Sequence, residues 1–192
     1  YEISAQQNNA NSLKELGDCY YNGLFVKKDY SKALNYYTQS TKQGNLCALF
    51  NLITLVETNN SKELYEIPEE IKTPENLLFI GDFYYTNINI QHNYYKAIQY
   101  YEKSAELDNQ IALLKLINHY ENSIGISSKN DQFYELPQKL NNSENNLFLG
   151  NYYYGKLDNK NIFKAIHYYE LSAKQNNSNA LCNLGKIYYN GN

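Results

Sequence analysis

LGDCYYNGLFVKKDYSKALNYYTQSTKQGN, residues 16–45, decides the fold of this 192-residue chain, because the chain contains three versions of it. The segment returns as IGDFYYTNINIQHNYYKAIQYYEKSAELDN at residues 80–109 and as LGNYYYGKLDNKNIFKAIHYYELSAKQNN at residues 149–177. Self-similarity at a fixed period of this size is the signature of a solenoid, in which each unit packs only on its neighbours. The sequence therefore predicts a stack of repeats rather than one globular core.

One small residue, called the anchor below, sets the register of the repeat. It is Gly17, Gly81, Gly150 and Gly185 in four units, and Ile53 and Ile117 in two weaker ones. Eight residues before each anchor stands a residue whose side-chain oxygen can cap a helix. These residues are Asn9, Asn45, Thr73, Asn109, Asn142 and Asn177. The anchors and the caps are independent features of the sequence, so their constant spacing supports six helix starts.

Each strong unit continues with a second helix, capped in this interpretation by Asp29, Asn93 and Asn161. In the first copy apolar residues follow at helical spacing, namely Tyr30, Ala33, Leu34 and Tyr37. Residues suited to a left-handed backbone are predicted to end the helices, namely Gly23 after a first helix and Gly44, Asp108 and Asn176 after second helices. The small anchors indicate that the two helices of a pair cross closely. The predicted fold class is therefore all-α, a superhelical solenoid of antiparallel helix pairs.

The weaker units add a second order of repetition. Tyr-Glu-Ile or Tyr-Glu-Leu begins 16 residues before three of the anchors, at Tyr1, Tyr65 and Tyr134. This predicts one solenoid over residues 1–192, built of double units at about 1–64, 65–133 and 134–192, with regular and degenerate pairs alternating. Pro68 and Pro137 favour a short second helix in the degenerate pairs, with caps at Ser61 and Asn130. Since the last copy stops after a first helix, we expect a fragment of a longer array.

Composition argues against several functional classes. The formal net charge is −3, and no block of like charges supplies the clustered Lys and Arg that a nucleic-acid partner requires. No apolar run approaches the roughly 20 residues of a membrane span. Aromatic residues are abundant and mostly tyrosine, with 22 Tyr, 7 Phe and no Trp. Tyrosine suits a helix surface on which the ring packs against a neighbour while the hydroxyl stays in contact with water.

Catalytic and metal chemistry finds no support in the residue pattern. His92, His119 and His167 have no counterparts in other copies, and His167 is expected to point outward from a second helix. The three cysteines occupy unrelated repeat positions and are expected to be buried free thiols. Carboxylates such as Asp18 and Asp82 follow the face expected to be solvated. The chain is therefore predicted to have no catalytic residues, no metal site and no cofactor.

The regular unit resembles the Sel1-like repeat, a relative of the tetratricopeptide repeat. The resemblance is carried by Leu16-Gly17, Tyr20-Tyr21-Asn22-Gly23, Val26, Asp29, Ala33-Leu34, Tyr36-Tyr37 and Gly44-Asn45, and it resumes in residues 180–191. It implies a non-catalytic scaffold or adaptor. It also leans towards an exported or envelope-associated bacterial protein, while the residues themselves leave the compartment open.

Recognition is predicted on the concave face, which first helices line in solenoids of this kind. The candidate contacts to a peptide or partner protein are Lys14, Asp18, Tyr21, Asp82, Tyr85, Tyr154 and Tyr189. The four tyrosines each stand four residues after an anchor glycine, where a column of rings would form a rigid, amphipathic platform. Packing against the next unit is the competing interpretation of that column. Two other functions stay open: a cell-envelope glycan or peptidoglycan module with Tyr stacking on sugars, and an RNA-binding helical repeat, which the acidic balance disfavours.

Overall fold

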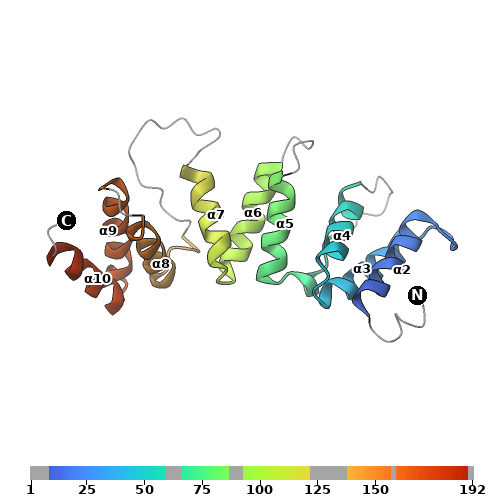
Figure 1. The fold of residues 1–192 in the computed structure, drawn as a ribbon, viewed down its shortest axis with the longest axis horizontal. Helices are drawn as coiled ribbons and strands as arrows, with labels where there is room; N and C mark the ends of the chain where they lie inside the picture. Colours follow the sequence, from blue (N-terminus) through green and yellow to red (C-terminus); the bar gives the residue numbers. More distant parts are fainter. Residues whose placement is uncertain (1–8, 59–65, 87–92, 122–137, 157–158, 190–192) are drawn as a thin grey trace. The chain divides into compact units, whose positions relative to one another are not determined.

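A computed structural model describes residues 9–58, 66–86, 93–121, 138–156 and 159–189. Within these ranges the chain forms nine α-helices and one 3-10 helix, and no strand, which confirms the all-α class (Figure 1). The helices are α2 (Ala10–Asn22), α3 (Tyr30–Lys42), α4 (Leu46–Thr58), α5 (Pro74–Thr86), α6 (Asn93–Glu106), α7 (Gln110–Glu121), α8 (Ser143–Tyr154), α9 (Asn159–Lys174) and α10 (Ser178–Tyr189), with the 3-10 helix η1 at Glu69–Ile71. The helices divide between two compact units, residues 1–100 and 101–192, and the boundary falls inside α6.

The caps of the first helices are confirmed at all six predicted residues. Asn9 Oδ1 accepts a hydrogen bond from the backbone N–H of Ser12 at the start of α2, at 3.1 Å. The same bond to the residue three positions on forms at the other five starts, from Asn45, Thr73, Asn109, Asn142 and Asn177. Each cap satisfies one of the backbone N–H groups that a helix start leaves without a partner.

Two of the three predicted second-helix caps are wrong. Asp29 caps α3 as expected, with 2.9 Å from its Oδ1 to the backbone nitrogen of Lys32. Asn93, however, is the first residue of α6, and α9 begins at Asn159, so Asn161 lies inside the helix. The predicted helix ends are confirmed, because Gly23, Gly44, Asp108 and Asn176 all have positive φ angles between 64° and 82°.

In the first unit α2 and α3 form an antiparallel hairpin, and α4 packs on α3 (Figure 1). The contacts run in opposite order along the two helices. Tyr21 at the end of α2 meets Tyr30 at the start of α3, with ring centroids 5.6 Å apart. At the other end of the hairpin, the Ser40 hydroxyl donates to the backbone oxygen of Ala10 at 2.6 Å. The predicted pair of antiparallel helices is therefore present, and contacts join α2 to α3 at both ends of the hairpin.

The small anchor makes room for an aromatic ring. A Cβ atom on Gly17 would lie 2.5 Å from two ring carbons of Tyr37, and Gly150 is covered by Tyr169 in the same way. Beside this contact a second ring of α3, Tyr36, stacks on Tyr20 of α2 at 5.6 Å. Equivalent stacked pairs recur as Tyr84–Tyr100 and Tyr153–Tyr168. The close crossing predicted from the anchors is thus a helix crossing filled by tyrosine.

The degenerate pair replaces this arrangement with aliphatic packing. In α4 the anchor is Ile53, which is fully buried, and the described part of the pair's second element is the three-residue η1 after Pro68. Ile71 of η1 is also buried, and Lys42 of α3 forms an ion pair with Glu70 of η1. The short element agrees with the helix-breaking effect expected of Pro68. Ser61 and Asn130, the predicted caps, lie outside the described residues.

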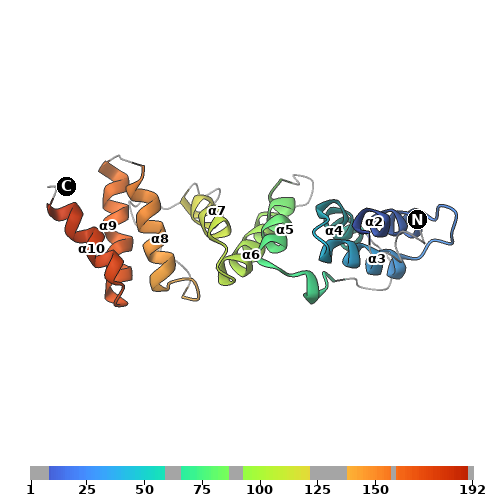
Figure 2. The same ribbon diagram turned by 60° about the horizontal axis from the view of Figure 1, so that its bottom comes forward.

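In the second unit α8 and α9 form the same kind of hairpin, and α10 packs along α9 (Figure 2). The Ser172 hydroxyl donates to the backbone oxygen of Ser143 at 2.7 Å, as Ser40 does in the first hairpin. Ala180, Leu184 and Ile187 bury one side of α10. Of the described helices, none has the length and apolar character to cross a membrane.

Candidate protein-interaction surface

Asp18, predicted as an exposed contact, lies at the meeting point of three helices. Its Oδ1 accepts a hydrogen bond from the Tyr37 hydroxyl of α3 at 2.7 Å and another from the side-chain amide of Asn51 in α4 at 2.8 Å. Its Oδ2 forms an ion pair with Lys14, one turn earlier in α2, at 2.7 Å. We call the group of Asp18, Tyr37 and Asn51 the clasp. Asp18 and Lys14 are therefore brought together, but both are held by contacts within the protein.

The second unit repeats the clasp with a neutral acceptor. Asn151 of α8 stands where Asp18 stands in α2, one residue after the anchor. Its Oδ1 accepts from the Tyr169 hydroxyl of α9 at 2.8 Å and from the Asn183 amide of α10 at 3.1 Å. In both units the clasp joins a helix pair to the first helix of the next pair. The recurrence shows a role in stacking the repeats.

Burial and charge change the acid–base chemistry of the clasp. Burial and the hydrogen bond to the Asp18 carboxylate raise the pKa of Tyr37 well above its usual range, so the phenol stays protonated. The same carboxylate raises the pKa of Lys14 and keeps it charged. In the second unit, burial raises the pKa of Tyr169. The expectation that Asp18 is simply solvated is therefore wrong, since it serves as an internal acceptor.

The predicted tyrosine column lies at the loop ends of the hairpins. Tyr21 packs on Tyr30, and its hydroxyl oxygen lies 3.4 Å from Oγ1 of Thr58 in α4. Tyr85 packs edge-on against Tyr94 in the first turn of α6, with centroids 5.5 Å apart, and keeps 43% of its surface exposed. These two rings thus combine packing within the repeat with exposure to solvent.

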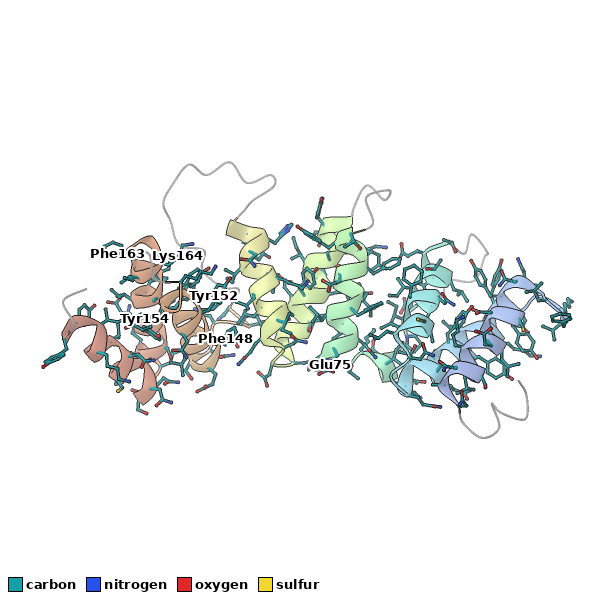
Figure 3. All side chains as sticks on the ribbon, viewed as in Figure 1. Glu75, Phe148, Tyr152, Tyr154, Phe163 and Lys164 are labelled. Carbon is teal, nitrogen blue, oxygen red and sulfur yellow. The ribbon has the colours of Figure 1, made fainter. Side chains whose placement is uncertain are left out.

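The other two tyrosines of the column belong to the second unit. Tyr154 is half-buried at the end of α8, and Figure 3 labels it with Phe163 and Lys164 of α9. Tyr189, the last residue of α10, is 91% exposed. Asp82 is half-buried in α5, and its backbone oxygen accepts from the Thr86 hydroxyl at 2.9 Å.

The most exposed apolar residues of the first helices in the first unit were missed from the sequence. Leu46 and Phe50 are each 48% exposed and lie one turn apart on α4. Phe50 stands three residues before its anchor, in register with Lys14 of α2, and its ring contacts Phe83 of α5 at 5.4 Å. We call Lys14, Asp18, Leu46, Phe50, Asp82 and Tyr85 the first-helix surface. This shared register could have identified Phe50 from the sequence, but α4 belongs to a degenerate unit, in which the repeat pattern is weak.

A charged cluster joins α4 to the next pair. Glu57 of α4 accepts from the Tyr84 hydroxyl at 2.6 Å and pairs with Lys96 of α6 at 2.9 Å, while only 16% of its side chain is exposed. The Lys96 ammonium also lies over the Tyr84 ring, 5.0 Å from its centroid. Lys32 over Tyr20 and Lys164 over Tyr153 repeat this contact in the other two pairs. Lysine in the second helix therefore covers the stacked tyrosines of every regular pair.

The histidines and cysteines of the described residues lie apart from one another along the repeats. Among the described residues, no three His, Cys, Asp or Glu side chains are placed to hold a metal ion. His167 is half-buried with its ring edge-on to Tyr168, His119 contacts Tyr120, and burial lowers the pKa of His119. His92 lies outside the described residues. The cysteines are free, as predicted, but the expectation of burial is wrong for Cys47 of α4 and Cys182 of α10, which are exposed, while Cys19 is half-buried.

The solved structures that are similar to the chain include two bacterial repeat proteins. A protective antigen of uropathogenic Escherichia coli strains, displaying an SLR fold, is 24% identical over 99% of this chain and 44% of its own, with a TM-score of 0.36. The chain thus spans less than half the length of that antigen. A Sel1 repeat protein from Oxalobacter formigenes is 26% identical over 94% of this chain and 79% of its own, with a TM-score of 0.34. No curated protein matches the chain.

The family comparison matches the repeats themselves. The model of the Sel1 repeat covers residues 10–45, 77–109, 145–177 and 178–192, more than half of the chain. The first three matched segments cover α2–α3, most of α5 with α6, and most of α8 with α9, and the last contains α10. The matched segments, the tyrosine-filled helix crossings and the repeated clasp agree on one assignment: the chain belongs to the Sel1 repeat family.

Proposed function

We propose that this protein is a non-catalytic scaffold that binds a peptide or a partner protein on the first-helix surface. A protein-interaction role is usual for the Sel1 repeat family. The observation that carries the proposal is the exposure of Leu46, Phe50 and Tyr85, whose apolar area the packing of the repeats leaves uncovered. Half-exposed aromatic and aliphatic side chains on rigid helices are suited to serve as anchors for a partner.

Adjacent contacts give this surface a rigid support. The clasp bonds α2 to α4 through Asn51, and Glu57 bonds α4 to α5 through Tyr84. Phe50 rests on Phe83 of α5, which is itself nearly buried. A partner that binds here would meet a surface already ordered before binding, which lowers the entropic cost of association.

The polar part of this surface is partly satisfied within the protein, since Lys14 and Asp18 form an ion pair within α2. The partner segment expected here is therefore apolar at its centre, to match Leu46, Phe50 and Tyr85. Nothing in the described residues specifically favours the glycan-binding alternative.

The test compares substitutions on the two kinds of helix within the first unit. Peptides selected from a random library by the wild-type protein would be titrated against a Leu46→Ser, Phe50→Ser double variant. We expect its affinity to fall at least about tenfold, because the apolar anchors are removed. Tyr95→Ser is the matched control, since Tyr95 is 67% exposed on the second helix α6. Equal loss in both variants, or no loss in the double variant with its helicity intact, would refute the first-helix surface.

A further inference from the structure

The loop between α2 and α3 carries two exposed apolar side chains at its tip. Leu24 is 53% exposed and Phe25 is 101% exposed. A Cβ atom on Gly23 would lie 3.3 Å from Cβ of Lys28, so the chain enters and leaves the loop side by side. The residues between these two form the tip, and the loop extends beyond the end of α2 in Figure 1.

The backbone of Phe25 holds a conformation that disfavours phenylalanine. Its φ is 62°, in the left-handed region where a bulky side chain is an outlier and where Asn and Asp are enriched. The other two regular pairs have Asn89 and Asp158 at this position, eight residues after the anchor. The next residue, Val26, is half-buried, so an apolar side chain of this loop can pack on the protein. Since the ring of Phe25 buries nothing, the fold gains no packing from it, and a binding role accounts for the strained position.

Hydrogen bonds on both sides fix the base of the loop. The backbone N–H groups of Gly23 and Leu24 donate to the backbone oxygen of Cys19, at 2.8 and 3.0 Å. On the other side the backbone N–H of Asp29 donates to the backbone oxygen of Tyr20 at 3.0 Å. The tip is therefore presented from a base that is ordered before any binding, which lowers the entropic cost of a contact.

Lysines stand beside the apolar tip. Lys27 and Lys28 are exposed, and the Lys28 ammonium lies 5.3 Å from the centroid of the Tyr30 ring. Residues 22–32 contain three lysines and one aspartate, a formal charge of +2, although the whole chain has a net charge of −3. That aspartate, Asp29, is engaged as the cap of α3. Phenylalanine and leucine beside lysine are the chemistry of a segment that lies at an anionic membrane surface.

The shape of the tip favours a lipid surface over a protein partner. A specific protein interface buries about 800 Å² on each partner, and two protruding side chains supply far less than this area. A bilayer requires only an apolar tip that reaches the acyl boundary and cations that stay at the level of the headgroups. The loop has both, within four consecutive residues.

We propose that the loop between α2 and α3 attaches the protein to the surface of a membrane rich in anionic lipids. Leu24 and Phe25 enter the boundary between headgroups and acyl chains, while Lys27 and Lys28 contact the headgroups. Attachment through one short loop is weak and reversible, and it requires no membrane-spanning helix. It is separate from the first-helix surface, and each proposal can fail without the other.

The absence of tryptophan from the chain allows a direct test. Phe25→Trp places a single indole at the tip, and its emission would be followed on titration with vesicles of phosphatidylserine and phosphatidylcholine in equal parts. We expect a saturable blue shift that brominated acyl chains quench. Binding to phosphatidylcholine alone should be at least about tenfold weaker, because the two lysines lose their anionic partners.

Leu46→Trp is the matched control for the position of the indole. Leu46 is 48% exposed at the start of α4, and the length of α3, about 20 Å, separates this end of the hairpin from the loop. The emission of this variant should not shift with vesicles. An equal shift in both tryptophan variants would show that vesicle binding does not occur through the loop.

Phe25→Asn separates a role in binding from a role in folding. Asparagine is the residue of the second copy and tolerates a positive φ, so the urea midpoint of unfolding should not fall. Co-sedimentation with the anionic vesicles should nevertheless weaken at least about tenfold relative to the wild-type protein. The double variant Lys27→Gln, Lys28→Gln should lose the preference for anionic vesicles and the sensitivity of binding to salt.

Several results would overturn the proposal. These are the absence of a shift with anionic vesicles, undiminished vesicle binding by Phe25→Asn, and a lower urea midpoint for that variant, which would show that the ring supports the fold. A blue shift that grows with protein concentration in the absence of vesicles would assign the tip to contacts between copies of the chain. Library peptides that bind the wild-type protein but not Phe25→Asn, without any vesicle binding, would assign it to a protein partner.

Discussion

The ring of Tyr37 occupies the space that a side chain at Gly17 would need, with 2.5 Å between a Cβ atom built there and the ring carbons. Tyr37 is buried and its hydroxyl is bound to Asp18, so the ring cannot move aside freely. Gly17→Ala should therefore destabilise the protein by about 1–2 kcal/mol. Overpacking costs about 1–3 kcal/mol, and this exceeds the gain of about 0.5–1 kcal/mol in helix propensity. Urea unfolding of the two proteins measures the difference.

Gly185→Ala is the matched control for this prediction. The position lies in the same register, but nothing approaches it within 4 Å. Only the higher helix propensity of alanine then changes the free energy of unfolding, so we expect a stabilisation of about 0.5–1 kcal/mol for α10. Opposite signs at the two anchors are the result expected. A destabilisation of equal size at both glycines would show that the tyrosine ring is not the cause.

The two clasps should differ in strength because one acceptor is charged. Tyr37→Phe removes a hydrogen bond to the carboxylate of Asp18, and Tyr169→Phe removes one to the neutral amide of Asn151. We expect losses of about 1.5–3 kcal/mol and about 0.5–1.5 kcal/mol respectively, since bonds to charged groups contribute more. Chemical denaturation of both variants tests the order. The reverse order would contradict the assignment of Asp18 as the acceptor.

Glu57 should matter far more than an exposed carboxylate of the same unit. Glu57→Ala removes the acceptor of the Tyr84 hydroxyl and the partner of Lys96. We expect a loss of about 1.5–3 kcal/mol, with a smaller loss for Glu57→Gln, which keeps an acceptor oxygen. Glu69 also pairs with a lysine, Lys72, but is 88% exposed. Glu69→Ala should change the stability by less than about 0.5 kcal/mol in the same thermal or urea unfolding experiment.

Alkaline pH should unfold the protein through its buried phenols. Burial raises the pKa of Tyr37, Tyr84, Tyr100 and Tyr169, and the negative charge of nearby carboxylates adds to the shift for the first three. In the unfolded chain these groups titrate at about 10, so above that pH the folded state holds more protons than the unfolded state. The stabilisation is complete below about pH 10 and is lost as the pH rises further.

Parallel titrations followed by phenolate absorbance and by helical circular dichroism measure this effect. We expect a part of the tyrosine titration to appear together with the loss of helicity. Ionisation of all 22 tyrosines in one smooth transition while the helices persist would contradict the prediction.

Local chemistry explains which helix starts were predictable. A first-helix cap such as Asn9 bonds a backbone N–H only three residues away, so a short pattern contains all the information. The start of α9 lies in the stretch Asp158-Asn159-Lys160-Asn161, where several residues have side chains able to cap a helix. The pattern alone cannot identify which of these residues caps α9, and the prediction of Asn161 was wrong. The division into three double units stays a prediction.

The surface residues were harder to predict because their partners are distant in the sequence. The sequence around Asp18 predicts a solvated helix residue, but its hydrogen-bond partners Tyr37 and Asn51 lie 19 and 33 residues further along the chain. The coupled repetition of acceptor, tyrosine and asparagine at residues 18, 37 and 51 and at 151, 169 and 183 contained that information. The exposure of Tyr189 has a different origin, since no described second helix follows α10 to cover it.

The stacked tyrosines give this protein an optical signature for each of its hairpins. The pairs Tyr20–Tyr36, Tyr84–Tyr100 and Tyr153–Tyr168 hold their rings within 13° of parallel, with centroids 5.5 to 5.6 Å apart. Phenol transition dipoles at this separation couple, so each pair adds an exciton band to the near-ultraviolet circular dichroism. Because the chain contains no tryptophan, no stronger chromophore masks these bands. The melting of the hairpins can thus be followed together in the light that their own rings absorb, without an added label.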